Sequence, residues 1–585
     1  MTQAVTTSHP EGEFRFLRTA DGGASGGGSD LWATYAAVRT LTWLKQPLPD
    51  ERREEISSYL NSCQNPDGSF SWQRGLPSDI WATFYCTQAL GDIGIGTTAT
   101  NALLDWLHSL QSPDGGFAMK PGQSADVWAT YYATRVFREV VGIPVPNIEK
   151  LSDWLSRLQR TNGGLAWNPA SEQIDVRATY YAVHAKDAAG IGGSVWDEFS
   201  LISWLQSMQD PNGGFRFAPE YKPCLWATFR ATRALAKLGA HAAHTSDIEK
   251  CKAWIMSRFD GRGFVRWDDY DMTDVWANFS AVGALQAIGV TVPALVATEV
   301  KFTIEQFEIS GGGYTYREPE IAGDALTTAS ALFQAHDQRN ASSIVSFSTW
   351  LKKAHMPWEN GIMYMPGRGA EVRCTLWAIA SLRYVGETLD DPQRIVTWIS
   401  ELQNPDGGFG YWQGRGSDLV STSAAVSVLQ LLDVDISEVI DVRQLSIFVK
   451  SCLEGTGASN VPGGPTGTSA AAQASRILHM LGELEVSQSL LWALNERIRL
   501  AGYFEQEGGL PTLYATYQVA LAQSKQKQAL SPQLSRFLGR LRAPSGVIGW
   551  TPLGAVRQDP LVIPLYKLLL RKLREPEFYL PPLVL

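Results

Sequence analysis

Two kinds of polar residue in this sequence stand where they could bind phosphate or a divalent cation. Arg177 and Arg373 occupy the third position of expected helix starts. An arginine beside the free N–H groups of a helix start is well suited to bind phosphate. Asp268, Asp269 and Asp271 form a carboxylate cluster, and carboxylate oxygens are preferred ligands of Mg²⁺. We predict that both arginines bind substrate and that Asp269 and Asp271 bind metal, with Mg²⁺ as the ion if a diphosphate is bound.

Each of these residues also has a structural interpretation. Arginine commonly pairs with a neighbouring carboxylate, and Glu371 stands two residues before Arg373. A short run of aspartates commonly forms a solvated turn. Cys224, which replaces an aspartate at another helix start, is interpreted as a small buried side chain. The sequence leaves both interpretations open for the arginines and for the aspartate cluster.

Aromatic residues are unusually frequent, with 21 Trp, 19 Tyr and 22 Phe. Aromatic faces attract cations, so such residues could line a site that stabilises positive charge. Five tryptophans recur at one position of a strict repeat and are predicted to form the core of the first half: Trp32, Trp81, Trp128, Trp226 and Trp276. Aromatic residues interpreted as off the repeat in the second half are predicted to line a substrate cavity: Trp358, Tyr364, Trp377, Tyr411 and Trp412.

A repeat of helix pairs must position all of these residues. The phrase Asp-x-Trp-Ala-Thr, with variations, begins at residues 30, 79, 126, 175, 224 and 274, and weaker copies begin at residues 324, 371 and 418. An amphipathic segment such as residues 102–111 precedes each copy, followed by a turn such as Gln-Asn-Pro-Asp-Gly at residues 64–68. Proline and glycine preset the turn, and the aspartate then caps the second helix. Degenerate copies extend the pattern to about twelve units over the chain.

A single helix pair cannot bury its own apolar face, so the pairs must stack on one another. The second helix of each pair is rich in Ala, Thr and Tyr and suits an inner ring, whereas the Trp- and Leu-rich first helix suits an outer ring. Twelve pairs could form one open superhelix or two closed barrels. Helical periodicity alone does not choose between these arrangements.

The turn, Gln-x-x-x-Gly-x-aromatic, resembles the repeat of squalene-hopene cyclases, and the helix start resembles the inner helices of class II terpene cyclases and protein prenyltransferase β subunits. The resemblance covers nearly the whole chain and weakens after about residue 440. It implies an all-α fold of two α/α barrels with six helix pairs each. The expected domains are residues 1–300 and 301–585, with the insertion of one barrel into the other left open.

The resemblance also implies an activity. Class II terpene cyclases carry Asp-x-Asp-Asp-Thr-Ala at one inner helix, and in register the matching segment is residues 324–329, where Leu326 replaces the acidic aspartate. The implied function is cyclisation of a linear prenyl chain, a diphosphate by preference, with a non-standard acid. Asp324 and Glu371 are the candidate acids, and Asp324 has the alternative role of a helix cap.

Two other functions remain open. The barrel could bind an isoprenoid without catalysis, because the middle aspartate of the motif is missing. A sugar-active α/α barrel is a third interpretation, since tryptophans and carboxylate pairs also serve glycosidases.

Protein prenyltransferases bind zinc through Asp-x-Cys, and none of the cysteines here has an aspartate two residues before it. A zinc of that type is therefore not expected. The implied cyclisation requires no cofactor apart from the possible Mg²⁺.

Bulk properties bear on the partners and the location of the protein. The net charge of −9 argues against a nucleic-acid partner. The start of the chain lacks a signal-peptide pattern, and widely spaced cysteines are typical of reduced thiols, so we expect a cytoplasmic protein. The apolar segment 560–573, which has basic residues at its end, is expected to dock on the core or to touch a membrane surface. The sequence does not predict the oligomeric state.

Overall fold

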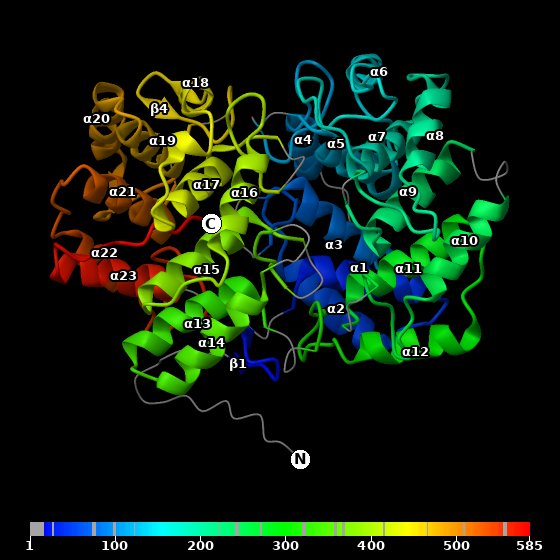
Figure 1. Ribbon diagram of the computed structural model, residues 1–585, viewed down its shortest axis with the longest axis horizontal. Coiled ribbons are helices and arrows are strands. Elements are labelled where there is room, and N and C mark those ends of the chain that lie inside the picture. Colours follow the sequence, from blue (N-terminus) through cyan, green and yellow to red (C-terminus); the bar gives the residue numbers. More distant parts are fainter. Residues whose placement is uncertain are drawn as a thin grey trace. The chain divides into compact units, whose positions relative to one another are not determined.

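The computed structural model describes residues 17–25, 29–72, 78–96, 101–121, 123, 125–219, 221–239, 245–268, 272–318, 323–355, 360–365, 369–412, 416–464, 466–506, 509–553 and 558–585. The chain forms two compact units. We call residues 27–319 the continuous unit, and residues 1–26 together with 320–585 the split unit. Both are built from paired helices, which confirms the predicted all-α class with two α/α barrels (Figure 1).

In the described part of the continuous unit, six inner helices close into a ring. Each inner helix packs against the next, and the last packs against the first. They are α1 (Leu31–Trp43), α3 (Ile80–Asp92), α5 (Val127–Arg135), α7 (Val176–Ala189), α9 (Leu225–Lys237) and α11 (Val275–Ala287). The outer helices are α2 (Asp50–Ser62), α4 (Asn101–Ser109), α6 (Ile148–Ser156), α8 (Glu198–Ser207), α10 (Thr245–Met256) and α12 (Ala294–Glu305). A π-helical turn, η1 (Val136–Val141), extends α5.

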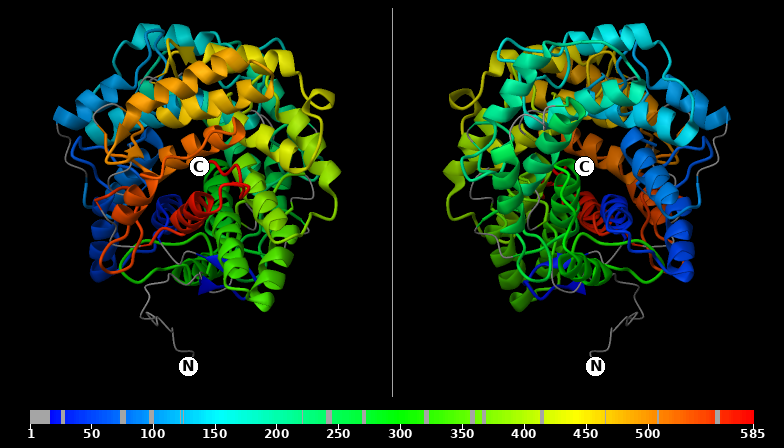
Figure 2. Two further views of the ribbon diagram at one scale, coloured as in Figure 1. Left: turned by 90° about the vertical axis from the view of Figure 1, so that its left-hand side faces the viewer. Right: turned by 90° about the vertical axis from the view of Figure 1, so that its right-hand side faces the viewer.

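The described residues of the split unit also form a closed ring of six inner helices (Figure 2, left). They are α13 (Ala325–Asp337), α15 (Val372–Tyr384), α17 (Leu419–Leu431), α19 (Thr468–Met480), α21 (Leu513–Lys525) and α23 (Val562–Arg574). The outer helices are α14 (Ala341–Lys353), α16 (Pro392–Leu402), α18 (Val442–Ser451), α20 (Leu484–Ala493) and α22 (Leu534–Leu541). Short 3₁₀ turns are η3 (Ile436–Glu438) and η4 (Leu494–Arg497).

The strands are two residues long and pair as antiparallel hairpins within the split unit. They are β1 (Leu17–Arg18) with β2 (Ala24–Ser25), β3 (Leu453–Glu454) with β4 (Gly457–Ala458), and β5 (Ile498–Arg499) with β6 (Gly502–Tyr503). The β1–β2 hairpin lies more than 290 residues from the rest of its unit in sequence. It carries the start of the chain into the ring that the second half of the chain completes.

The inner helices begin where the repeated aspartate caps them. In the repeat at Asp126, the carboxylate accepts the N–H of Ala129 at 2.8 Å. Four residues after the aspartate, the hydroxyl of Thr130 accepts the backbone N–H of the turn residue Phe117 at 3.0 Å. The threonine therefore ties each turn to its inner helix, which explains its recurrence in the repeated phrase.

The glutamine and glycine of the turn join one outer helix to the next. The side-chain amide of Gln111 donates to the carbonyls of Gly115, at 3.1 Å, and Pro146, at 2.9 Å. Gly115 has φ of +106°, and a Cβ there would lie 2.4 Å from the carbonyl oxygen of Lys150 in α6. Only glycine combines this backbone conformation with so close a packing of the turn under the following helix.

A hydrogen bond accepted by the repeated threonine also closes each ring. Tyr314, in the turn after α12, donates its N–H to Thr34 of α1 at 2.9 Å. In the split unit, Ala24 of β2 donates its N–H to Thr328 of α13 at 2.9 Å. The expected boundary between residues 300 and 301 therefore falls inside α12, which the continuous ring needs for closure, and the start of the chain belongs to the split unit. In sequence, the continuous unit is therefore inserted between the two segments of the split unit, which is one of the arrangements that the sequence left open.

Residues 560–573 form most of α23 and dock on the core of the split unit. Val562, Leu565 and Leu569 are fully buried there, so the apolar face is not available to a membrane surface. Among the described helices, none combines the length and apolar character that a bilayer-spanning segment requires.

Candidate functional site

The starts of the inner helices gather at one rim of each ring. In a typical repeat, Asp175 accepts the N–H of Ala178 at 2.9 Å, and the N–H of Val176 donates to the carbonyl of Phe217 in the next turn at 3.0 Å. These amides are thus already hydrogen-bonded within the protein. The expectation that free helix N–H groups assist the arginines in binding phosphate has no support at this rim.

Aromatic side chains line the inside of the continuous ring, as the repeat predicts. The ring of Trp32 lies 4.6 Å from Trp276 and 5.8 Å from Trp226, between centroids. Trp81 lies 4.5 Å from Trp128 on the other side of α1. Helices α1 and α9 are not neighbours in the ring, so the contact between Trp32 and Trp226 reaches across it. A concentration of aromatic faces of this kind stabilises a cation held against it.

Asp274, the cap of α11, is the most unusual carboxylate of this rim. It is fully buried, and its Oδ1 atom accepts the N–H groups of Trp276 and Ala277, both at 2.8 Å. Its Oδ2 atom has no hydrogen-bond partner among the described residues. Burial raises the pKa of Asp274 to about 6, although the two amides and the nearby Arg317 and Arg266 act to lower it. Asp274 can therefore carry a proton near neutral pH.

Two buried arginines accompany this acid. The guanidinium of Arg266 lies 3.9 Å over the ring of Trp226 and 4.0 Å over that of Trp267. Arg317 is 4% exposed, and its Nε and one terminal nitrogen have no hydrogen-bond partner among the described residues. We call Asp274, Arg266, Arg317, Trp226 and Trp276 the Asp274 cluster.

Sequence analysis did not single out this cluster, although a signal for it exists. The second residue after the apolar turn residue is aromatic in several repeats, including Trp72, Trp167 and Phe217, but is Arg266 before α11. The helix start that follows has Asn278 in place of threonine. Arg177, Arg373 and Cys224 break the repeat within a helix start, whereas Arg266 breaks it in the preceding turn.

In the split unit, the structure brings together three of the predicted residues. The terminal nitrogen of Arg373 donates to Glu371 at 3.1 Å and to the hydroxyl of Tyr411 at 2.6 Å. Tyr411 in turn donates a short hydrogen bond to Glu371. Burial, followed by the charge of Glu371, raises the pKa of the adjacent Cys374 thiol well above its usual value. The three side chains form a closed triangle in which Glu371 is paired with a cation.

The other predicted residues have more ordinary surroundings. Asp324 caps α13 and accepts the N–H of Thr327 at 2.8 Å. Arg177 donates through two nitrogens to Asp175, at 2.9 and 2.7 Å, and lies 4.7 Å over Phe217. Asp324 therefore makes the contact of a helix cap, and Arg177 makes that of an arginine paired with a neighbouring carboxylate.

The aromatic candidates divide into three groups. Tyr364 and Tyr411 occupy a repeated turn position after all, since their carbonyls accept the first N–H of α13 and of α15. Trp377 is fully buried, and Trp412 packs edge-to-face on Tyr411 at 5.1 Å. Trp358, Asp269 and Asp271 lie outside the described residues. Among the residues described, no group of three or more His, Cys, Asp or Glu side chains is arranged to hold a metal ion.

The model of the prenyltransferase alpha-alpha toroid domain matches residues 5–84, 72–190, 184–369 and 362–499. The chain belongs to this toroid family. A curated relative, the protein farnesyltransferase subunit beta of Pisum sativum, is 26% identical over 296 residues, which are 47% of this chain and 57% of the relative. The chain thus spans just over half the length of that relative.

Solved structures with similar toroids are more distant in sequence. Candida albicans protein geranylgeranyltransferase-I, complexed with GGPP, is 15% identical, with a TM-score of 0.38, over 44% of this chain and 83% of its own. The ent-copalyl diphosphate synthase of Streptomyces platensis is 12% identical, with a TM-score of 0.33, over 76% of this chain and 94% of its own. The type II terpene cyclase MstE of Scytonema is 15% identical, with a TM-score of 0.31, over 49% of this chain and 94% of its own.

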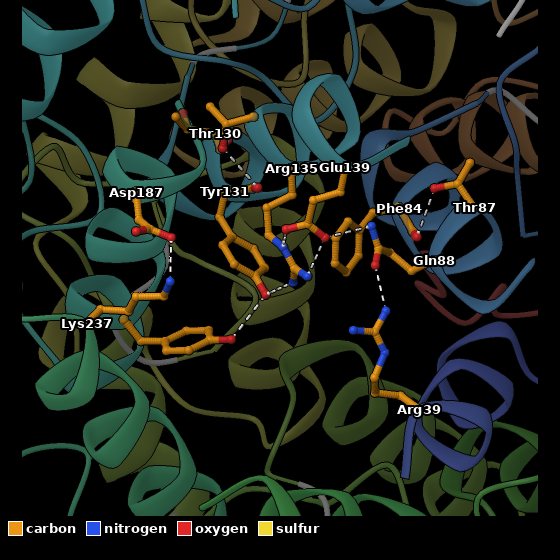
Figure 3. A network of polar contacts seen from close by, with 12 residues as sticks. Arg39, Phe84, Thr87, Gln88, Thr130, Tyr131, Arg135, Glu139, Asp187 and Lys237 are labelled. Carbon is orange, nitrogen blue, oxygen red and sulfur yellow. Dashed lines mark hydrogen bonds and ion pairs between the residues drawn. The ribbon is translucent and has the colours of Figure 1, made fainter. Parts of the chain in front are cut away.

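The continuous toroid is also polar toward the C-terminal ends of its inner helices (Figure 3). Arg135 pairs with Glu139 at 2.6 and 2.7 Å and donates to Tyr131, while Gln88 bridges Glu139 to Arg39. Burial acts to raise the pKa of Glu139, but the pairing with Arg135 outweighs it and holds the pKa below its usual value. The charges of this network satisfy one another, so it suits structural closure better than proton donation.

Proposed function

We propose that this toroid protein is an isoprenoid-processing enzyme that cyclises a linear prenyl chain through a carbocation, with Asp274 as the acid. The observation that carries the proposal is the buried Oδ2 of Asp274, which lacks a partner among the described residues and belongs to a carboxyl group whose pKa is about 6. Solved toroids are described as a type II terpene cyclase and as a geranylgeranyltransferase bound to GGPP, which supports an isoprenoid as the substrate class.

Protonation of an alkene requires an acid that is protonated, dry and strong. Burial keeps a fraction of Asp274 protonated at neutral pH. After the proton is transferred, Arg266 and Arg317 stabilise the carboxylate left behind, and two backbone N–H groups hold its other oxygen. The Asp274 cluster thus combines the acid with groups that favour its conjugate base.

The alkyl cation formed by protonation needs shielding from water and negative electrostatic potential nearby. The rings of Trp276 and Trp32 supply both near Asp274, whereas one face of Trp226 is already covered by the guanidinium of Arg266. A single contact between a cation and an aromatic face contributes about 0.5–2 kcal/mol, so several are required. These tryptophans lie close enough together to provide more than one such contact.

This assignment revises the acids expected from the sequence. Glu371 is paired with Arg373 and accepts a hydrogen bond from Tyr411, so both of its carboxylate oxygens are engaged within the protein. Asp324 caps a helix like its siblings in other repeats. The preference for a diphosphate substrate relied on Arg177 and Arg373, which donate hydrogen bonds to Asp175 and to Glu371 and Tyr411. We therefore propose no particular head group for the substrate, and the assay below compares diphosphates with alcohols.

The test pairs two isosteric substitutions. The protein is incubated with farnesyl and geranylgeranyl diphosphates and with the corresponding alcohols, and cyclic products are identified by mass spectrometry. Asp274→Asn should lower turnover at least about 100-fold, the usual contribution of a general acid, because asparagine still caps the helix but cannot donate this proton. Asp126→Asn, the same change in the half-buried cap of α5, should leave turnover within about twofold.

The rate should also fall as the pH rises above about 6, since only the protonated form of Asp274 is active. Full activity of Asp274→Asn, or a rate that increases from pH 6 to pH 8, would contradict the assignment of the acid.

A second function is favoured by Leu326, which stands where the related cyclase motif has its acid. In that case the protein binds an isoprenoid without converting it. Thermal stabilisation by geranylgeraniol with no cyclic product, in wild-type and Asp274→Asn proteins alike, would identify this function.

A further inference from the structure

Residues 580–585 are buried in the split unit. Leu583 and Val584 are fully buried, and Leu580 is 4% exposed, whereas the preceding Tyr579 is 52% exposed. The segment follows α23 and has no regular secondary structure. It runs to the end marked C in Figures 1 and 2, among the inner helices of the split ring.

Side chains of two inner helices bind the backbone of this segment. The indole N–H of Trp377 in α15 donates to the carbonyl of Val584 at 2.8 Å. From α21, the hydroxyl of Tyr517 donates to the carbonyl of Pro581 at 2.7 Å, and the side-chain amide of Gln518 donates to that of Leu583 at 2.8 Å.

All three donors are at most 1% exposed: Trp377, Tyr517 and Gln518. In the order of the ring, α15 and α21 stand opposite each other, with α17 and α19 between them on one side and α23 and α13 on the other. A segment bonded to both therefore lies across the axis of the ring. Helices α17 and α19 carry many alanines and serines, whose small side chains leave room for it.

This pattern of donors selects for a peptide. A hydrocarbon chain on the axis would leave three buried donors without acceptors, which is unfavourable. An extended backbone supplies carbonyls at the required spacing whatever its side chains are. Pro581 and Pro582 also hold the segment extended before it binds, which lowers the entropic cost of binding.

We propose that the axis of the split ring is a binding channel for an extended apolar peptide, and that residues 580–585 are its intramolecular occupant. The matching ligand in trans is the same segment, residues 580–585, of a second copy of this chain. The channel lies within the split unit and uses no residue of the Asp274 cluster, so it is independent of the proposed cyclisation.

The test uses a chain that ends after Tyr579 and a labelled peptide, Leu-Pro-Pro-Leu-Val-Leu. Fluorescence polarisation should show saturable binding to the shortened chain and at least tenfold weaker binding to the full chain, whose channel is occupied. A peptide with lysine at the position of Leu583 is the matched control and should not bind, because that side chain is fully buried.

Gln518→Leu in the shortened chain should weaken peptide binding at least tenfold by removing one of the three donors. Geranylgeraniol should not displace the peptide, since it offers no matching carbonyls. A folded shortened chain that does not bind the peptide, or that binds the lysine peptide equally well, would overturn the proposal.

The shortened chain could also fail to fold by itself. In that event the peptide is added during refolding, and recovery of native helical content supports the channel. Failure of the peptide to restore folding overturns it. Neither result depends on whether Asp274→Asn alters turnover.

Discussion

Asp274 has the same residue type as its sibling caps, and Asp79 and Asp175 are also buried, but Asp274 is 0% exposed and its Oδ2 atom has no hydrogen-bond partner among the described residues. Its pKa of about 6 lies about two units above the usual aspartate value. Between about pH 4 and 6 the folded state binds more protons than the unfolded state, so this group makes the protein less stable as the pH rises. Asparagine does not titrate. The free energy of unfolding of Asp274→Asn relative to wild type should therefore increase by up to about 3 kcal/mol from pH 4 to pH 7.

Calorimetric or chemical unfolding at several pH values measures this difference, with Asp126→Asn as the matched change in a half-buried cap. If the free energies of unfolding of Asp274→Asn and wild type differ by the same amount at every pH, then Asp274 ionises in the folded protein as it does in the unfolded chain. Together with the loss of turnover, the expected result would show that the acid is maintained at a cost in stability.

The sequence predicts caps but not their environments. That Asp324 caps a helix could be anticipated from its place in the repeat, because capping depends only on local backbone geometry. The two arginines whose charges act on Asp274, Arg266 and Arg317, come from two different turns. Such convergence appears only once the ring has closed, so the candidate acid could not be identified from the local phrase.

At the scale of the element, the repeated threonine joins each turn to its inner helix. Thr130→Val removes the acceptor of the Phe117 N–H, which is buried and would be left without a partner. The cost of such an orphaned group is about 1–3 kcal/mol, so the unfolding midpoint of the continuous unit should fall by several degrees. Thr130→Ser keeps the hydroxyl and is the matched control. Equal melting of the two variants would refute this role for the threonine.

The helices themselves were largely predictable. The phrase Asp-x-Trp-Ala-Thr identified the inner helices because capping, small side chains and a strict period all indicated the same element. The degenerate copies near the end of the chain still mark α19, α21 and α23. The π-helical turn η1 was not predictable, since no residue in 136–141 distinguishes it from a continued α-helix.

At the scale of the whole molecule, the two rings differ in what lies toward their own axes. Large aromatic side chains such as Trp32, Trp226 and Trp276 line the continuous ring. The split ring has small residues in α17 and α19 and receives residues 580–585 instead. The sequence showed that aromatic side chains concentrate in the first half, but the insertion of a segment into a ring depends on contacts between residues distant in the chain.

The closure of the split ring by the start of the chain is a further long-range contact. The carboxylate of Asp21 accepts the indole N–H of Trp350 in α14 at 2.8 Å and, more weakly, the N–H of Gly323 at 3.2 Å. It also accepts hydrogen bonds from Thr19 and Gly23, so one carboxylate organises the β1–β2 hairpin and anchors it. Asp21→Ala removes these bonds and should detach the hairpin from α13, exposing the hydroxyl of Thr328.

Hydrogen exchange measured by mass spectrometry can locate this effect. In Asp21→Ala the amides of α13 and α14 should exchange at least tenfold faster, because the ring then lacks the turn that covers the start of α13. Amides of α5 and α7, in the continuous unit, should be unchanged. Arg18→Ala, which alters an exposed side chain of the same hairpin, is the control and should leave both regions protected. Uniformly faster exchange in both units would mean that Asp21 supports the whole chain rather than the closure of one ring.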